Sequence, residues 1–134
     1  MKLLEQFRLI SRIGLFLYLG AVFTLCLINM ESVPELPKDF LGIPLDKWAH
    51  FVMFLPYPML IYGSFHNITS RPYGHITMLG IIIFSGILLA GGIEVLQGMT
   101  EYRSMETLDL AADLLGLFAS SFLILCASAI YNKW

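Results

Sequence analysis

The chain of 134 residues is long enough for one domain but too short for a soluble enzyme domain beside a separate membrane anchor. Its residues are 57% hydrophobic and only 13% charged, with a mean hydropathy of +0.76. Ordinary globular domains have roughly 45–50% apolar and about 25% charged residues, so this composition indicates a membrane protein. The net charge of −2 offers no basic surface of the kind that binds nucleic acid, and we exclude nucleic acid as a partner.

Four stretches without Asp, Glu, Lys or Arg follow one another along the chain: residues 13–30, 48–70, 72–93 and 114–132. A helix crosses the hydrocarbon core of a bilayer in about 20 residues, so each stretch is long enough to span it. We therefore predict an all-α fold, in which a single domain of residues 1–134 forms a four-transmembrane-helix bundle. The predicted helices cover about residues 10–30, 46–66, 74–97 and 107–131.

The basic residues predict the orientation of this bundle. Five lie on the side of the two termini: Lys2, Arg8, Arg12, Arg71 and Lys133. Three lie on the other side: Lys38, Lys47 and Arg103. Because positive residues favour the cytoplasmic side of a membrane, we expect both termini to be cytoplasmic.

Prolines divide the first half of the chain. Pro34, Pro37 and Pro44 exclude a continuous helix between the first two spans and predict an external loop, either a lid over the bundle or a plain connector. In the second span, Pro56 and Pro58 remove backbone donors and predict a kink.

The stretch from Gly91 to Gly116 is unusually polar for a segment between two apolar runs. It holds Glu94, Gln97, Glu101, Arg103, Glu106, Asp109 and Asp113. Ionisable groups cost about 2.5–3.5 kcal/mol each near a membrane core, so those that occur there tend to be paired and functional. Glu94 and Gln97 share one helix face by their spacing, as do Asp109 and Asp113.

Four helices that run up and down bring the start of the second, the end of the third and the start of the fourth to the same membrane face. The polar residues that meet there are our candidate binding site: Asp46, Lys47, His50, Glu94, Gln97, Arg103, Asp109 and Asp113.

Several members of this site have structural alternatives. Asp46 suits a helix N-cap, Lys47 can extend to the interface, and His50 and Gln97 can serve as hydrogen-bonding contacts between helices. We expect Arg103 to form a salt bridge with at least one of Glu94, Asp109 and Asp113, because its planar guanidinium can hold two carboxylates at once.

The motifs at these positions resemble those of the VanZ-like family of small bacterial membrane proteins. The matching residues, from about Asp46 to Gly116, are Asp46-Lys47-x-x-His50-Phe51, Glu94-x-x-Gln97, Arg103, Asp109 and Gly116. The chain departs from the family pattern at Asp113, where asparagine is usual, and at Ser120, where a glycine is common. The resemblance implies a multi-pass protein of the bacterial inner (cytoplasmic) membrane, with a role in the cell envelope and in teicoplanin-type antibiotic resistance. It implies no particular reaction.

Three functions are compatible with these residues. We favour an accessory or binding protein, without cofactor or metal, whose polar pocket at the outer face takes a lipid head group, a lipid-linked wall intermediate or a lipoglycopeptide. A membrane-embedded hydrolase or transferase is the second: Glu94 or Asp113 would act as base, and His50 as acid or as ligand of a divalent ion. The third is a structural subunit of an envelope complex, with an envelope protein as partner.

Overall fold

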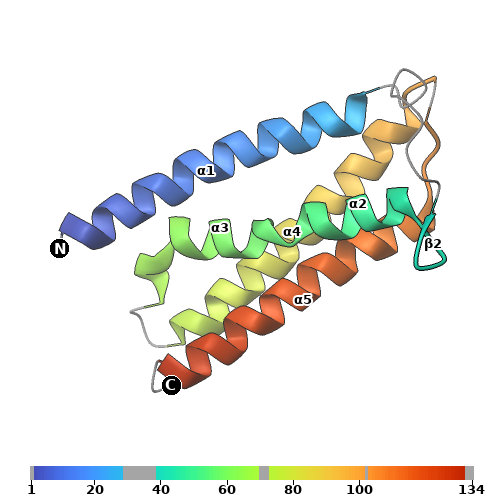
Figure 1. Ribbon diagram of the computed structural model, residues 1–134. Helices are drawn as coiled ribbons and strands as arrows, with labels where there is room; N and C mark the ends of the chain where they lie inside the picture. Colours follow the sequence, from blue (N-terminus) through green and yellow to red (C-terminus); the bar gives the residue numbers. More distant parts are fainter. Residues whose placement is uncertain (1, 29–38, 70–72, 102, 132–134) are drawn as a thin grey trace.

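The computed structural model describes residues 2–28, 39–69, 73–101 and 103–131. Its elements in chain order are α1 (Lys2–Leu27), β1 (Asp39–Phe40), β2 (Ile43–Pro44), α2 (Leu45–Phe54), α3 (Pro56–Ser64), the short 3₁₀ helix η2 (His66–Ile68), α4 (Gly74–Gly98) and α5 (Thr107–Tyr131). They form an elongated helical bundle with both termini at one end (Figure 1).

Three of the described helices, α1, α4 and α5, are long and apolar enough to cross a membrane. The predicted ranges for α4 and α5 agree with the structure to within a residue, whereas α1 begins at Lys2 instead of near residue 10. The segment predicted as the second span is divided between α2 and α3, and each of these is shorter than a membrane-spanning helix.

The interruption between α2 and α3 follows from Pro56, which has no N–H to donate to the preceding turn. Leu55 keeps a helical backbone, with φ −61° and ψ −41°, and its N–H donates to the carbonyl of Val52 at 3.3 Å. The hydroxyl of Tyr18, from α1, donates to the carbonyl of Met53 at 2.8 Å. Because the backbone stays helical through the interruption, α3 continues in the direction of α2 (Figure 1).

A short hairpin of two two-residue strands precedes α2, and the all-α prediction did not include this hairpin. Strand β1 pairs antiparallel with β2, and the turn residues Leu41 and Gly42 both have positive φ, 55° and 75°, as type I′ hairpin turns require. Pro44 occupies the N-cap of α2, and the cap has no side-chain hydrogen bond. The interpretation of Asp46 as N-cap was therefore wrong: the helix begins at Leu45, and Asp46 lies in its first turn. Pro34 and Pro37 lie outside the described residues.

Close approaches of small residues position α5 between α2 and α4. A methyl group at Gly116 would collide with the carbonyl oxygen of Phe51 in α2, and one at Gly86 of α4 would collide with the side chain of Leu117. Leu117 is fully buried in the core between these helices. The start of α2 is thereby held against the start of α5.

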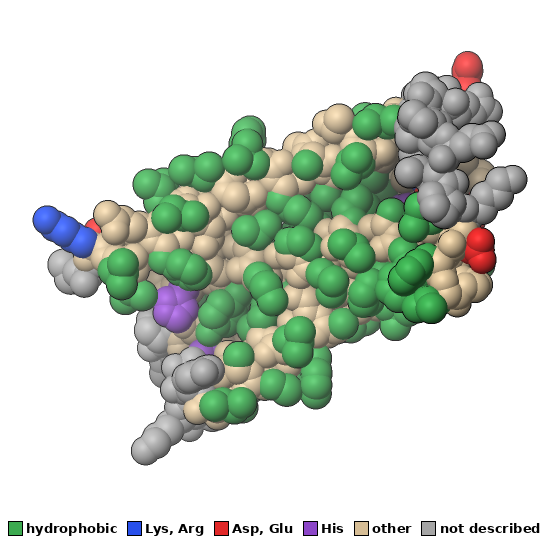
Figure 2. All heavy atoms as spheres, viewed as in Figure 1, with side chains coloured by type: hydrophobic (Ala, Val, Ile, Leu, Met, Phe, Trp, Pro, Cys, Tyr) green, Lys and Arg blue, Asp and Glu red, His purple; other side chains and the backbone are tan. Residues whose placement is uncertain are grey.

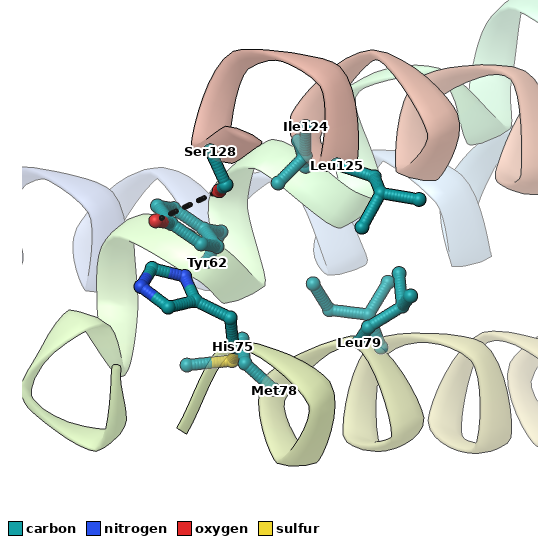
Figure 3. Close-up of a pocket in the computed structure, with 8 residues that line it drawn as sticks. Tyr62, His75, Met78, Leu79, Ile124, Leu125 and Ser128 are labelled. Atoms are coloured by element: carbon teal, nitrogen blue, oxygen red, sulfur yellow. Dashed lines mark hydrogen bonds between the residues drawn. The ribbon is translucent and has the colours of Figure 1, made fainter. Parts of the chain in front are cut away.

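Large apolar side chains cover the outside of the bundle, and Figure 2 shows them along the visible face, with the charged side chains at its two ends. A cavity of only about 10 Å³, room for about one water molecule, lies between Tyr62, His75 and Ser128 (Figure 3). The Tyr62 and Ser128 hydroxyls are 3.4 Å apart beside it.

Candidate polar site at one end of the bundle

The structure brings the eight candidate residues together at the end of the bundle opposite the termini. Asp46, Lys47 and His50 come from the first turns of α2, and Asp109 and Asp113 from the first turns of α5. Glu94 and Gln97 come from the last turns of α4, and Arg103 precedes α5. Antiparallel α4 and α5, joined by a short connection, place the end of one helix beside the start of the next.

Lys47 is the main cation of the site. Its Nζ contacts Asp109 Oδ1, donates to Glu106 Oε2 at 2.6 Å, and lies 3.5 Å from Asp46 Oδ2. The Lys47 side chain is only 14% exposed and that of Asp109 only 3%. Lys47 therefore points into the carboxylates of α5 instead of extending along the apolar surface to water.

His50 is buried between two carboxylates. Its Nδ1 is 2.9 Å from Asp113 Oδ1, and its Nε2 is 3.7 Å from Asp109 Oδ2. All three side chains are at most 5% exposed. The hydrogen bond to Asp113 holds the imidazole against α5, and Asp109 lies on the other side of the ring.

Arg103 forms its ion pair with Asp46, at 3.1 Å between Nη2 and Oδ1. The expected salt bridge from Arg103 to Glu94, Asp109 or Asp113 was wrong. Because α2 packs directly on α5, its own Lys47 and His50 reach the aspartates of α5 first. Arg103 instead connects the segment before α5 to the first turn of α2.

The two predicted residues of α4 are buried and incompletely paired. Glu94 and Gln97 are each 1% exposed. Glu94 Oε2 accepts a hydrogen bond from the backbone N–H of Glu106 at 3.1 Å. Among the described residues, Glu94 Oε1, Gln97 Oε1 and Asp113 Oδ2 are buried without a hydrogen-bond partner. Buried polar atoms are normally satisfied, so these three unpaired acceptors are a feature of this site.

The cluster has more acids than bases. Its carboxylates are Asp46, Glu94, Glu106, Asp109 and Asp113, and its permanent cations are Lys47 and Arg103. Lys47 is paired with Glu106 and Asp109, and Arg103 is paired with Asp46. The unpaired acceptors lie on the deeper residues, so the interior of the site favours a hydrogen-bond donor or a cation.

A cavity of about 160 Å³ opens beside this cluster, between α1, α2 and α4. Its lining combines polar and apolar residues: Leu25, Cys26, Asp46, Ala49, His50, Met53, Gln97 and Arg103. Cys26 is a free thiol. A larger apolar groove of about 450 Å³ lies on the other side of α2, between Trp48, Phe51 and Leu115, and faces outward.

Glu106 belongs to the site but was not among the candidates. Its side chain accepts from Lys47, its N–H donates to Glu94, and its carbonyl accepts the first hydrogen bond of α5, from Leu110 at 3.3 Å. The sequence does place Glu106 among the acidic residues directly before the fourth predicted helix, and this position could have indicated that it belongs to the site. Its contact with Lys47, 59 residues earlier, could not be read from that position.

Comparisons with family models, curated proteins and solved structures found no match for this chain. The resemblance to the VanZ-like family therefore stays a prediction that depends on the motif residues alone.

Proposed function

We propose that this chain is an accessory or binding protein of the bacterial inner membrane that takes the anionic head group of a lipid or of a lipid-linked envelope component. The observation that supports this proposal is the cavity between α1, α2 and α4, where Arg103 and Gln97 face the apolar Leu25 and Met53. Arg103 has five N–H donors, and among the described residues its bond to Asp46 uses only Nη2, which leaves donors for a phosphate or carboxylate oxygen.

The size of the cavity restricts the ligand. Pockets that enclose drug-sized molecules measure about 300–1,000 Å³. A cavity of about 160 Å³ accommodates one head group, such as a phosphate, and not an entire lipoglycopeptide. Among the three ligand classes considered, the lipid head group and the lipid-linked intermediate therefore fit best, with the hydrocarbon chains lying outside the cavity along α1.

A binding experiment tests this function with matched lipids. The chain, purified in detergent, is titrated with phosphatidic acid and with the diacylglycerol that has the same acyl chains, and its thermal stability is recorded. Ligand at about 100 times its Kd stabilises a protein by roughly 2.7 kcal/mol, so phosphatidic acid should raise the melting temperature and diacylglycerol should not. Arg103→Gln should abolish the difference, whereas Arg8→Gln, at the other end of α1, should retain it.

The proposed membrane placement has four spans with both termini cytoplasmic, α2 and α3 together forming the second span over residues 45–64. Cysteines introduced singly at Asp39 and Asn67, in a chain whose Cys26 and Cys126 are replaced by alanine, report the orientation. An impermeant thiol reagent added to intact cells should label position 39 and not position 67. Labelling at position 67 and not at position 39 would show that the orientation is the opposite of the one proposed.

The phenotype of Gln97→Leu distinguishes the binding protein from the structural subunit, and turnover of a substrate tests the hydrolase or transferase. A binding protein should lose its teicoplanin-resistance phenotype at normal membrane abundance. A structural subunit of an envelope complex should instead lose abundance, its own or that of its partner. For a hydrolase or transferase, the buried pair of His50 and Asp113 is the supporting observation, and turnover of a lipid-linked substrate by the purified chain would favour it.

A further inference from the structure

Three buried side chains from three different helices converge at the deepest part of the polar site. They are His50 of α2, Glu94 of α4 and Asp113 of α5, and one ligand atom of each lies within 4.8 Å of the others. Their exposed fractions are 4%, 1% and 0%. Imidazole nitrogens and carboxylate oxygens are both ligands of divalent transition metals such as Zn²⁺.

The second observation is that this set has free acceptors. Glu94 Oε1 and Asp113 Oδ2 are buried and have no hydrogen-bond partner, although the described part of the chain offers donors nearby in Lys47 and Arg103. Those two cations are turned to Asp109 and Asp46. Among the described residues, Asp113 contacts only the imidazole of His50 and Glu94 only a backbone N–H, so neither buried carboxylate has a lysine or arginine to offset its desolvation.

We propose that His50, Glu94 and Asp113 bind one divalent transition-metal ion such as Zn²⁺. Two ligands at about 2.1 Å from Zn²⁺ in tetrahedral geometry lie about 3.4 Å apart, so atoms within 4.8 Å need only small side-chain movements. The 2.9 Å contact between His50 Nδ1 and Asp113 Oδ1 is already close to that separation. This inference goes beyond the proposed head-group binding and does not depend on it, and it departs from our expectation of a site without metal.

The surrounding residues fit the outer shell of such a site. With the metal at Nδ1, the Nε2–H of His50 faces Asp109 Oδ2, now at 3.7 Å, and Lys47 holds Asp109 in place. Metal-binding histidines usually donate their second N–H to a carboxylate in this way. His50 also lines the cavity of about 160 Å³, so the proposed site lies next to this cavity.

A neighbouring group, Asp46, His50 and Asp109, also meets the distance requirement, but it is not available. Asp46 is paired with Arg103, and Asp109 with Lys47. A metal there would have to displace two ion pairs, whereas the deeper set displaces only the contact between His50 and Asp113.

The test uses the full chain in detergent micelles, stripped with a chelator and titrated with Zn²⁺ and Co²⁺. The wild type should bind one equivalent, and Co²⁺ should give the visible absorption of a four- or five-coordinate ion. Glu94→Gln and Asp113→Asn should each weaken binding by at least about 100-fold, the upper end of what loss of an outer-shell partner costs. The exposed Glu101→Gln, at the same end of the bundle, is the matched control and should bind like the wild type.

A second measurement uses the wild type alone, in case either variant does not fold. X-ray absorption of the Zn²⁺-loaded chain should give an imidazole nitrogen and oxygens in the first shell and no sulfur, which excludes Cys26 of the same cavity. Absence of stoichiometric binding by the wild type would overturn the proposal. Sulfur ligation, or folded Glu94 and Asp113 variants that bind as tightly as the wild type, would also overturn it.

Discussion

Lys47→Met removes the cation that connects α2 to α5 and retains the length of the side chain. Of its three acidic partners, Asp46 and Glu106 have side chains 38% and 50% exposed, so their pairs with Lys47 contribute about 0–1 kcal/mol each. Asp109 is 3% exposed, and removing one partner of a buried pair costs about 3–5 kcal/mol because the other charge stays buried and uncompensated. We expect Lys47→Met to lower the free energy of unfolding by about 3–5 kcal/mol.

Equilibrium unfolding in mixed detergent and SDS micelles, followed by circular dichroism, measures this change. Lys2→Met, which removes an exposed lysine at the opposite end, is the control and should be near neutral. The double variant Lys47→Met/Asp109→Asn should recover most of the loss, since the amide leaves no uncompensated charge, and the double-mutant cycle isolates the pair. A loss below about 1 kcal/mol for Lys47→Met, or no recovery in the double variant, would refute the buried ion pair.

Three further predictions concern the packing and the charge of the bundle, and all are tested by the same unfolding assay. Gly116→Ala should destabilise the chain by about 1–3 kcal/mol, because the added methyl group overlaps the α2 backbone. Gly91→Ala is the control: its methyl group meets open space, so it should be neutral or stabilise the chain by up to about 1 kcal/mol. Equal effects of the two substitutions would contradict the close approach of Gly116 to α2. Tyr18→Phe should cost about 1–3 kcal/mol by leaving the Met53 carbonyl unpaired, and no loss would mean that another donor replaces the hydroxyl. Glu94→Gln should leave the stability of the metal-free chain unchanged or raise it by at most about 3 kcal/mol, because it removes one of several neighbouring carboxylates. A large loss of stability would show that the Glu94 carboxylate is already neutralised by a partner.

The position of the polar site could be predicted because topology alone determines it. Charged residues delimit the apolar runs, and antiparallel helices joined by short connections return to the same end, so residues of α2, α4 and α5 had to meet there. The ends of α4 and α5 were equally predictable, since polar residues begin where each apolar run stops. The partners within the site were not predictable, because they depend on the rotation of each helix about its axis.

The wrong partner predicted for Arg103 follows from the unknown rotation of each helix about its axis. Spacing shows that Asp109 and Asp113 share a face, but it does not show whether that face turns to α2 or to the segment before α5. The close contact at Gly116 turns it to α2, so Lys47 and His50 become the partners of the two aspartates and Arg103 pairs with Asp46.

The resulting cluster has two parts with different physical roles. In the first part, Arg103 and Lys47 are paired with carboxylates of neighbouring segments, and these contacts hold α2 and α5 in register. Deeper in, Glu94 and Asp113 keep free oxygens next to a histidine at a location where any unpaired acceptor is costly. A site selected only for helix packing gains nothing from those oxygens, because apolar residues of the same size would satisfy the bundle better. The ion pairs of Lys47 and Arg103 therefore account for the stability of this end of the bundle, and the deeper residues are the ones that the proposed metal ion would stabilise.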